Sequence, residues 1–357
     1  MSEDTHAADY LARHWQTGSS ELQQKVDELL AEVHSGSDNL ELYRDMLLSI
    51  VRMAQADRNR WDAKIMRHTI RELEAAFSRL EQFKRRRKVT VFGSARTLQD
   101  CDLYRLAQQM GKLLADNEYM AITGGGGGIM EAVHTGAGLD HSLSFNITLP
   151  FEQKPNPIVA GTQHDLSFRF FFLRKLFLVK EADAVILCPG GFGTLDETLE
   201  VLTLIQTGKS PMVPVILLDE PGGRYWASLL EFFRQHLLDG EYILASDLNL
   251  LQLAESPQVA LQSIQQFYRN YHSSRWHDER YVIRLNQPLS ADAMDKLNAD
   301  FADICTHGGF TQQQDPGLAA DDPELQHLTQ LTFLLNARAQ GRLRALIDEV
   351  NKPQNLQ

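Results

Sequence analysis

The segment PGGFGTLDE, residues 189–197, places freely turning backbone, a threonine hydroxyl and a carboxylate close together in the chain. It follows the apolar run AVILC (184–188) and begins a stretch with helical periodicity. Backbone amides at a helix N-terminus attract an anion, which the helix dipole also favours. The carboxylate of Glu197 would then lie beside a sugar whose phosphate the loop holds. The candidate phosphate-binding residues of this segment are Gly190, Gly191, Gly193 and Thr194.

A second interpretation uses the same side chains. Thr194 followed three residues later by Glu197 matches a capping box, in which the two side chains satisfy each other's free backbone donors. A carboxylate that closes a capping box points back to the start of the helix. The Glu197 side chain can therefore point either to the helix start or into a phosphate cleft. A second glycine-rich loop, together with Arg174, favours the orientation that faces the cleft.

That second loop is the run of five glycines in TGGGGGIMEAVHTGA (123–137). Consecutive glycines cost conformational entropy, and their use is close approach of the backbone to a ligand. Ile129 stands where the last glycine of GxGxxG would be, and the GK[ST] of a P-loop is absent, so the segment does not support an NTPase. It predicts a phosphate contact; the alternative is a loop without a ligand.

Two further segments carry candidate ligand groups. VFGSAR (91–96) offers the Ser94 hydroxyl and the Arg96 cation after an apolar run, although an ordinary turn would look the same. FRFFFLRKLFLVKEAD (168–183) is locally basic in an acidic chain, so Arg174 and Lys175 are candidates for orienting an anionic substrate. A basic solvated face is the plainer reading of that helix. Its core-facing residues are predicted to be Phe172, Leu176 and Val179.

Composition excludes several other classes of function. The net charge of −12 argues against a protein that grips nucleic acid or an anionic membrane, and no apolar run approaches a membrane span. The three cysteines form no CxxC, which fits a reducing, cytoplasmic setting, and the polar start MSEDTHAADY does not resemble a signal peptide. We find no HExxH, no GxSxG and no metal-ligand spacing. His134 is expected to be structural and Cys188 to pack in the core.

The order of apolar and amphipathic stretches predicts an α/β protein. A doubly wound, Rossmann-like parallel sheet is expected, because strands alternate with helices. The expected strands are 89–93, 119–123, 142–147, 184–188 and 213–218, and the expected helices are 101–116, 129–138, 168–182, 194–207, 224–238 and 256–271. We predict a helical N-terminal extension (1–88, with helices 20–34 and 38–83), a nucleotide-binding catalytic domain (89–273) and a small α+β appendage (274–357). The appendage should contain strands 281–285 and 328–336, helix 290–304 and a final helix at RLRALIDEV.

Taken together, GSAR, TGGGGG, LPFEQKPN (149–156), LRK and the complete PGGFGTLDE resemble the LOG ("lonely guy") family of cytokinin riboside 5′-monophosphate phosphoribohydrolases. The resemblance covers roughly residues 89–270. The terminal extensions look more like those of larger bacterial relatives, which include nucleoside 5′-monophosphate nucleosidases. The family's HERK-like motif appears only as FLRK, so Phe172 and Leu173 replace its polar residues.

The resemblance implies hydrolysis of an N-glycosidic bond, giving free base and ribose 5-phosphate. Glu197 would stabilise the oxocarbenium-like state and activate water, while Arg174 would orient the substrate. The resemblance assigns phosphate binding to Ser94, Gly125, Gly126, Gly127, Lys175, Gly190, Gly191, Gly193 and Thr194. No cofactor or metal is expected. The resemblance also implies a homo-oligomer, because the family's active sites are completed near a dimer interface.

The sequence leaves other functions open. A non-enzymatic carrier of a nucleotide or of a molybdenum-type cofactor could use the same scaffold, although such a carrier does not need the carboxylate. The lysine decarboxylase label often given to this family lacks the Schiff-base lysine and its acidic partner that pyridoxal phosphate requires.

Overall fold

A computed structural model of the protein describes residues 20–33, 39–57, 59–148, 154–315 and 323–356. The chain divides into two compact units, one up to Arg71 and one from Glu72 onward. The segment MSEDTHAADY and residues 149–153 of the LPFEQKPN motif lie outside the described residues. Within the described part, none of the helices has the combined length and apolar character that crossing a membrane requires.

The first unit is helical, as predicted, but its long helix is interrupted. It contains α2 (Ser20–Val33), α3 (Leu40–Gln55) and the first turns of α4 (Arg60–Leu80). The expected helix 38–83 is therefore two helices. Asp57 adopts a positive φ of 42°, and the Asn59 side chain accepts hydrogen bonds from the amides of Trp61 and Asp62, which starts a new helix.

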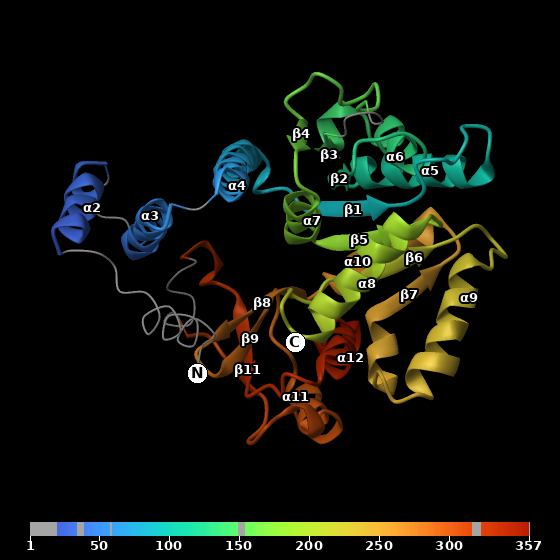
Figure 1. The fold of residues 1–357 in the computed structure, drawn as a ribbon. Coiled ribbons are helices and arrows are strands. Elements are labelled where there is room, and N and C mark those ends of the chain that lie inside the picture. The colour runs from blue at the N-terminus through green and yellow to red at the C-terminus, as the bar shows by residue number, and fades with distance from the viewer. Residues whose placement is uncertain (1–19, 34–38, 58, 149–153, 316–322, 357) are drawn as a thin grey trace. The chain divides into compact units, whose positions relative to one another are not determined.

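The second unit is built on a seven-stranded parallel sheet, which confirms the doubly wound α/β class (Figure 1). The strands occur in the order β4-β3-β2-β1-β5-β6-β7. Their bounds are β1 Lys88–Phe92, β2 Met120–Thr123, β3 Ser142–Ile147, β4 Asp165–Phe168, β5 Ala184–Leu187, β6 Val215–Leu218 and β7 Leu251–Ala254. The two edge strands, β4 and β7, were not predicted, because four-residue segments at a sheet edge bury too few side chains to give an apolar run.

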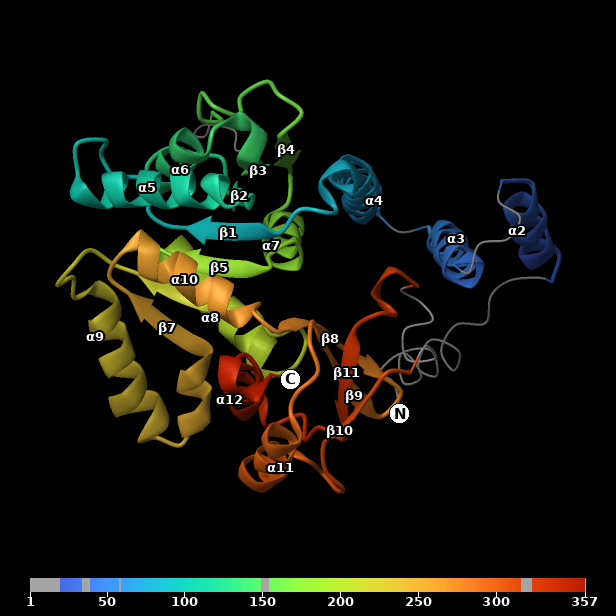
Figure 2. The ribbon, with the colours of Figure 1, turned by 180° about the vertical axis from the view of Figure 1, so that it is seen from behind.

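Helices cover both faces of this sheet. One face packs against α5 (Asp102–Asp116), α6 (Ile129–Ala137) and α10 (Pro257–Phe267), which lie in front of the sheet in Figure 2. The other face packs against α7 (Phe171–Lys180), α8 (Phe192–Gln206) and α9 (Tyr225–Phe232), the last continuing as the π-helix η3 (Phe233–Leu238). The five inner strands, β1, β2, β3, β5 and β6, are buried on both faces, which explains why they read as continuous apolar runs.

Two of the three residues predicted to face the core from the basic helix are not buried, whereas the third, Val179, is partly buried and packs against the core. Leu173 and Phe177 are buried, whereas Phe172 and Leu176 are about half exposed. The helix begins at Phe171 because the preceding residues form β4 and pair with β3. Phe177 then packs between the rings of Phe145 and Phe168, with ring centroids 6.1 and 5.3 Å away. This rotation determines which of the basic side chains reach the cavity described below.

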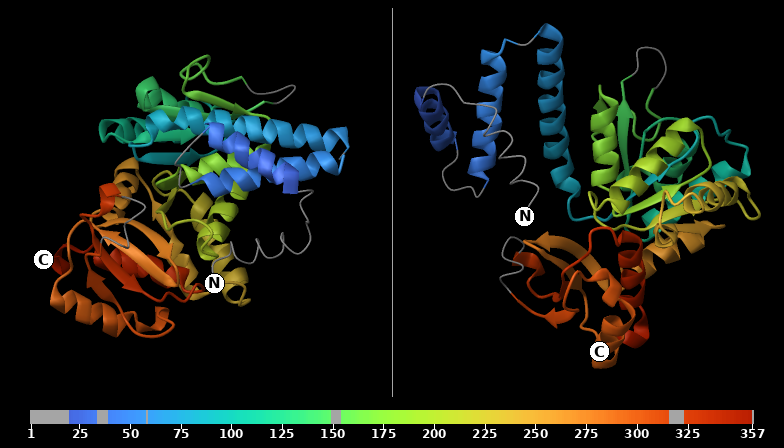
Figure 3. Two further views of the ribbon diagram at one scale, coloured as in Figure 1. Left: turned by 90° about the vertical axis from the view of Figure 1, so that its left-hand side faces the viewer. Right: turned by 60° about the horizontal axis from the view of Figure 1, so that its bottom comes forward.

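The C-terminal part of the same unit has a four-stranded antiparallel sheet in the order β10-β11-β9-β8, seen beside α12 in Figure 3. Its elements are β8 Tyr271–His277, β9 Arg280–Leu285, β10 Thr311–Gln313, β11 Thr329–Phe333, α11 Ala291–Asp300 and α12 Gln340–Val350. The predicted strands at 281–285 and 328–336 and the final helix are confirmed, while β8 and β10 were missed. The proposed division of the chain after residue 273 falls inside β8 and stays a prediction.

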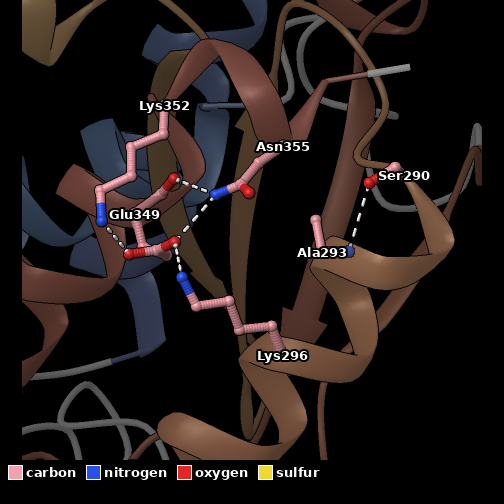
Figure 4. Close-up of polar contacts among 6 residues, drawn as sticks. All are labelled: Ser290, Ala293, Lys296, Glu349, Lys352 and Asn355. Carbon is pink, nitrogen blue, oxygen red and sulfur yellow. Dashed lines mark hydrogen bonds and ion pairs between the residues drawn. The ribbon is translucent and has the colours of Figure 1, made fainter.

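A buried carboxylate joins α11 to α12. Glu349 accepts hydrogen bonds from Lys296 Nζ (2.7 Å), Lys352 Nζ (2.6 Å) and Asn355 Nδ2 (3.0 Å), as Figure 4 shows. Ser290 caps α11 by accepting from the Ala293 amide at 3.2 Å, in keeping with the predicted helix start. Burial raises the pKa of Glu349, but these donors outweigh it and lower the pKa to about 2.

Candidate active site

The candidate site lies where the strand order changes direction. From β1 the chain adds β2, β3 and β4 on one side of the sheet and then β5, β6 and β7 on the other. Ligands of doubly wound sheets bind at the carboxyl ends of the strands where the order reverses in this way. A cavity of about 850 Å³ opens there. Its lining includes residues 91–96 at and after the end of β1, Gly124 after β2, Arg174 of α7, residues 190–197 after β5 and Tyr225 of α9.

Ser94 joins the two glycine-rich loops. Its amide donates to the Pro189 carbonyl at 3.2 Å, and its carbonyl accepts from the Ile129 amide at 3.0 Å, at the start of α6. The Ser94 hydroxyl accepts from the Arg96 amide at 3.1 Å. Gly128, with a φ of +63°, lies so close to Ser94 that a Cβ there would collide with the Ser94 carbonyl. Ser94 is therefore a cavity residue held in place by both loops, as its predicted role requires.

The glycine run contributes less to the cavity than its sequence suggests. Gly124 lines it, but Gly125, Gly126 and Gly127 are not among its lining residues. The Gly125 amide donates to the Thr123 hydroxyl at 3.0 Å, and the Gly125 carbonyl accepts from the Asn156 amide at 2.8 Å. Gly125 also adopts a φ of +74°, and a Cβ there would crowd Ser144. Gly125 thus serves a tight turn and close packing.

A buried histidine supports that turn. His134 Nε2 lies 3.1 Å from both the Thr123 hydroxyl and the Leu143 carbonyl, and its Nδ1 lies 3.1 Å from Asn156 Nδ2. Asn156 Nδ2 also donates to the carbonyls of Gly125 and Gly126 at 3.2 Å. Burial lowers the pKa of His134 to about 4, so the ring is neutral at physiological pH. This geometry agrees with the structural role predicted for His134.

The second glycine loop does not form a capping box. Helix α8 begins at Phe192 with Gly191 as its N-cap, and no side chain caps its start. Thr194 is the third residue of the helix, which is too far along to act as the cap. Its hydroxyl lies against Gly190, where a Cβ would collide with it. The capping interpretation of the Thr194–Glu197 spacing is therefore wrong, and the carboxylate is free for another use.

Glu197 lies at the cavity wall with only 8% of its surface exposed. Its Oε2 is buried and has no hydrogen-bond partner among the described residues. Burial raises the pKa of Glu197 to about 7, against the opposing charges of Lys175 and Arg174, and the carboxylates of Glu200 and Asp196 add to the rise. A carboxyl group that titrates near neutral pH can accept or donate a proton there.

Arg174 is brought to the same cavity. Its Nε donates to the Phe145 carbonyl at 2.8 Å, and its guanidinium lies so close to Gly124 that a Cβ there would collide with Nη2. Burial lowers the pKa of Arg174, while the nearby Glu197 raises it, and an arginine remains charged in either case. A partly buried cation and a buried carboxylate therefore face one cavity, as the sequence predicted.

Lys175 occupies a different place from the one predicted. It does not line the cavity, and its Nζ lies 2.7 Å from Asp196 Oδ2 and 2.5 Å from Glu200 Oε2. Partial burial lowers the pKa of Lys175, but these two carboxylates outweigh it and raise the pKa above its usual value. The lysine ties α7 to α8 on either side of Glu197.

Tyr225 is the main cavity residue that sequence reasoning missed. It lines the cavity, and its hydroxyl donates to the Gly190 carbonyl at 2.7 Å. The available signal was its position: Tyr225 follows the EPGGR turn after β6, the strand next to β5. Among the described residues there is no cluster of His, Cys, Asp and Glu that would suit a metal ion.

Comparison with known proteins agrees with this geometry. The sequence model of the family described as "Possible lysine decarboxylase" matches residues 127–264. The chain is 30% identical over 210 residues to the probable cytokinin riboside 5′-monophosphate phosphoribohydrolase LOGL6 of Oryza sativa subsp. japonica, covering 56% of this chain and 78% of the rice protein. It is 32% identical over 168 residues to the cytokinin riboside 5′-monophosphate phosphoribohydrolase LOG7 of Arabidopsis thaliana, covering 45% of this chain and 74% of LOG7.

Solved structures with a similar fold include two molybdenum-cofactor proteins. The molybdenum cofactor binding protein of Rippkaea orientalis shares 23% identity at a TM-score of 0.38, with 51% of this chain and 96% of that chain covered. The molybdenum cofactor carrier protein of Chlamydomonas reinhardtii shares 18% identity at a TM-score of 0.36, with 51% and 98% covered. The identity and coverage shared with the rice and Arabidopsis proteins show that the chain belongs to the LOG family.

Proposed function

We propose that this protein hydrolyses the N-glycosidic bond of a nucleoside 5′-monophosphate, releasing the free base and ribose 5-phosphate. The observation that carries the proposal is Glu197, a buried carboxyl group without a hydrogen-bond partner among the described residues, at the wall of a cavity beside the start of α8. The family relationship supports it, because the rice and Arabidopsis relatives are named as phosphoribohydrolases of a riboside 5′-monophosphate.

The phosphate end of the substrate fits the start of α8. Gly190, Gly191, Gly193 and Thr194 line the cavity there, and the first amides of a helix have no partner within the helix. Amides at this position and the helix dipole together favour a dianion. The hydroxyl groups of Ser94 and Thr194 are on the same wall and would add donors.

The chemical step requires a base for water and stabilisation of a positive sugar. In the proposed reaction the C1′–N bond breaks, the base leaves with the bonding electrons, and water forms the new bond to C1′. Glu197 as a carboxylate takes the proton of that water, and its negative charge stabilises the oxocarbenium-like sugar; the departing base takes up a proton. Because the pKa of Glu197 is about 7, both protonation states are populated near neutral pH.

Arg174 has a positioning role in this scheme. The hydrogen bond from its Nε to Phe145 leaves the two terminal nitrogens for Glu197 and for substrate oxygens. An arginine held on the β3 backbone by α7 keeps one orientation, which an exposed lysine would not.

The alternative is a carrier that binds a nucleotide or cofactor without turning it over. The glycine loops suit both functions, but a carboxyl group buried next to a phosphate site weakens anion binding and has no use in a carrier. The placement of Glu197 therefore favours the enzyme.

The test is release of free base from AMP, GMP, CMP, UMP and cytokinin riboside monophosphates. We expect at least one of them to be hydrolysed and Glu197→Gln to lose 100-fold or more, the loss of a general base being worth about 10²–10⁴. Glu349→Gln is the matched control, because it alters another buried glutamate, in α12 and away from the cavity, and should keep full activity. No base release from any substrate, or a Glu197→Gln variant as active as the wild type, would overturn the proposal.

We also propose that the protein forms a homo-oligomer through the outer face of α7. Phe171, Phe172 and Leu176 are 54%, 54% and 45% exposed, and Phe192 of α8, which lines the cavity together with Phe171, is 93% exposed. Exposed apolar side chains gathered at a cavity rim mark an interaction surface. Light scattering at micromolar concentration should show at least a dimer, and Phe172→Glu should dissociate it; a monomeric wild type would contradict this proposal.

A further inference from the structure

A tyrosine hydroxyl group is hydrogen-bonded to the backbone of the proposed phosphate-binding loop. The hydroxyl of Tyr225, the first residue of α9, donates to the carbonyl of Gly190 in the β5–α8 loop at 2.7 Å. Among the described residues, it is the only hydrogen bond between the β6–α9 segment and the glycines of PGGFGTLDE. It therefore couples two loops that are far apart in sequence.

Tyr225 itself is held rigidly. Its ring packs edge-on against Trp226, with centroids 4.7 Å apart, and the Trp226 indole is fully buried and donates to the Leu218 carbonyl at 3.2 Å. Asp219 is also buried and accepts from the Glu220 amide at 2.9 Å, which shapes the turn after β6. The tyrosine hydroxyl thus approaches Gly190 from a fixed frame.

A hydrogen bond to a carbonyl also determines where the next amide points. A trans peptide is planar, so the Gly190 carbonyl and the Gly191 N–H point in opposite directions. Gly191 is exposed, lines the cavity and is the N-cap residue of α8, and its amide has no hydrogen-bond partner among the described residues. Glycine at both ends of this peptide leaves its plane free to rotate unless something holds it.

We propose that Tyr225 is a positioning residue that locks the Gly190–Gly191 peptide plane and so holds the Gly191 N–H toward the phosphate of the substrate. This inference rests on the proposed function and deepens it. Without the tyrosine hydroxyl the peptide plane samples both orientations, and in one of them the carbonyl oxygen faces the anion. The lock removes that repulsive arrangement before the ligand arrives.

The test is binding of ribose 5-phosphate, which carries the phosphate whatever the base is, measured by calorimetry on the full-length protein. Tyr225→Phe keeps the ring on Trp226 and removes only the hydroxyl. We expect its Kd to rise about three- to tenfold, the range that a single hydrogen bond contributes. In turnover, KM for the nucleotide should rise by a similar factor with kcat nearly unchanged, because Glu197 stays on an intact helix.

Tyr268→Phe is the matched control. Its hydroxyl also donates to a backbone carbonyl, that of Asp183 at 2.6 Å, but at the opposite end of β5. It should leave the Kd within twofold of the wild type. Equal weakening by both variants, an unchanged Kd in Tyr225→Phe, or a loss confined to kcat would overturn the lock. If ribose 5-phosphate binds as expected but no base is released by the wild type, the proposed reaction fails while the lock stands.

Discussion

Replacing Glu197 with glutamine should make the protein more stable at alkaline pH and nearly inactive. The carboxyl group is buried with 8% exposure, and its pKa rises to about 7 from an ordinary value of 4.5. The folded protein therefore binds the proton more tightly than the unfolded chain does. Its contribution to stability is fully present below pH 4.5 and is lost as the pH rises through 7. Glutamine keeps the shape of the side chain and has no charge to bury.

The magnitude follows from the two pKa values. The step from 4.5 to about 7 corresponds to about 3 kcal/mol at 1.36 kcal/mol for each factor of ten, and we take about 2–3 kcal/mol because the group keeps some access to water. At pH 4 the wild type and Glu197→Gln should be equally stable. At pH 8 the variant should be more stable by about 2–3 kcal/mol.

Urea unfolding at pH 4, 6 and 8 provides the assay, followed by tryptophan fluorescence, to which the fully buried Trp226 beside the site contributes. Comparing variant with wild type at each pH cancels the titration of all other groups. A difference that stays constant across this range, or that favours the wild type at pH 8, would refute the reasoning, because the carboxyl group would then be solvated and ordinary. If Glu197→Gln loses activity while its free energy of unfolding at pH 8 increases, the buried carboxyl group is retained for the reaction and not for stability.

The remaining predictions use other contacts. Glu349→Gln should lower the free energy of unfolding by about 1–2 kcal/mol at pH 6. This is less than the Glu349 pKa of about 2 suggests, because the side chains of Lys296 and Lys352 are 47% and 44% exposed to water. The difference from the wild type should shrink as the pH falls from 4.5 through 2, which urea unfolding at pH 6 and pH 3 checks. Lys175→Met removes a charge that lowers the pKa of Glu197, so the acid limb of kcat/KM should move to higher pH with little change in the Kd for ribose 5-phosphate; a large change in Kd instead would restore Lys175 to phosphate binding. Gly190→Ala puts a Cβ onto the Thr194 hydroxyl and should weaken ribose 5-phosphate binding more than tenfold, measured by calorimetry, whereas binding equal to the wild type would show that the loop adjusts.

The fold class was readable from the sequence because buried parallel strands are apolar on both faces. β1, β2, β3, β5 and β6 were therefore found within a residue or two. The edge strand β4 was not predicted, because Asp165 and Ser167 interrupt its apolar character, and the predicted helix 168–182 began three residues before α7. The core face of α7 was mispredicted at Phe172 and Leu176, because this helix carries apolar residues on its exposed side as well as on its buried side.

The site was predictable where chemistry requires a residue type at a strand end. Ser94, Arg174, Glu197 and the glycines at 190, 191 and 193 line one cavity because β1 and β5 are neighbours and their carboxyl ends share one edge. The phosphate role of the glycine run after β2 stays a prediction: only Gly124 of this run lines the cavity, and positive φ and tight packing against Ser144 explain Gly125 without a ligand. Composition alone does not separate these two uses of glycine.

The sequence by itself determined which residue types lie at the ends of the strands, since spacing and periodicity follow from local backbone preference and from burial. The tertiary structure alone decided that Glu197 faces the cavity, that Lys175 forms ion pairs instead of lining the cavity, and that Tyr225 donates a hydrogen bond to Gly190. Each of these depends on contacts between elements that are adjacent in space but separated in the chain. Local pattern carries no information about such contacts, and the pKa and hydrogen bonding of a side chain are set by them.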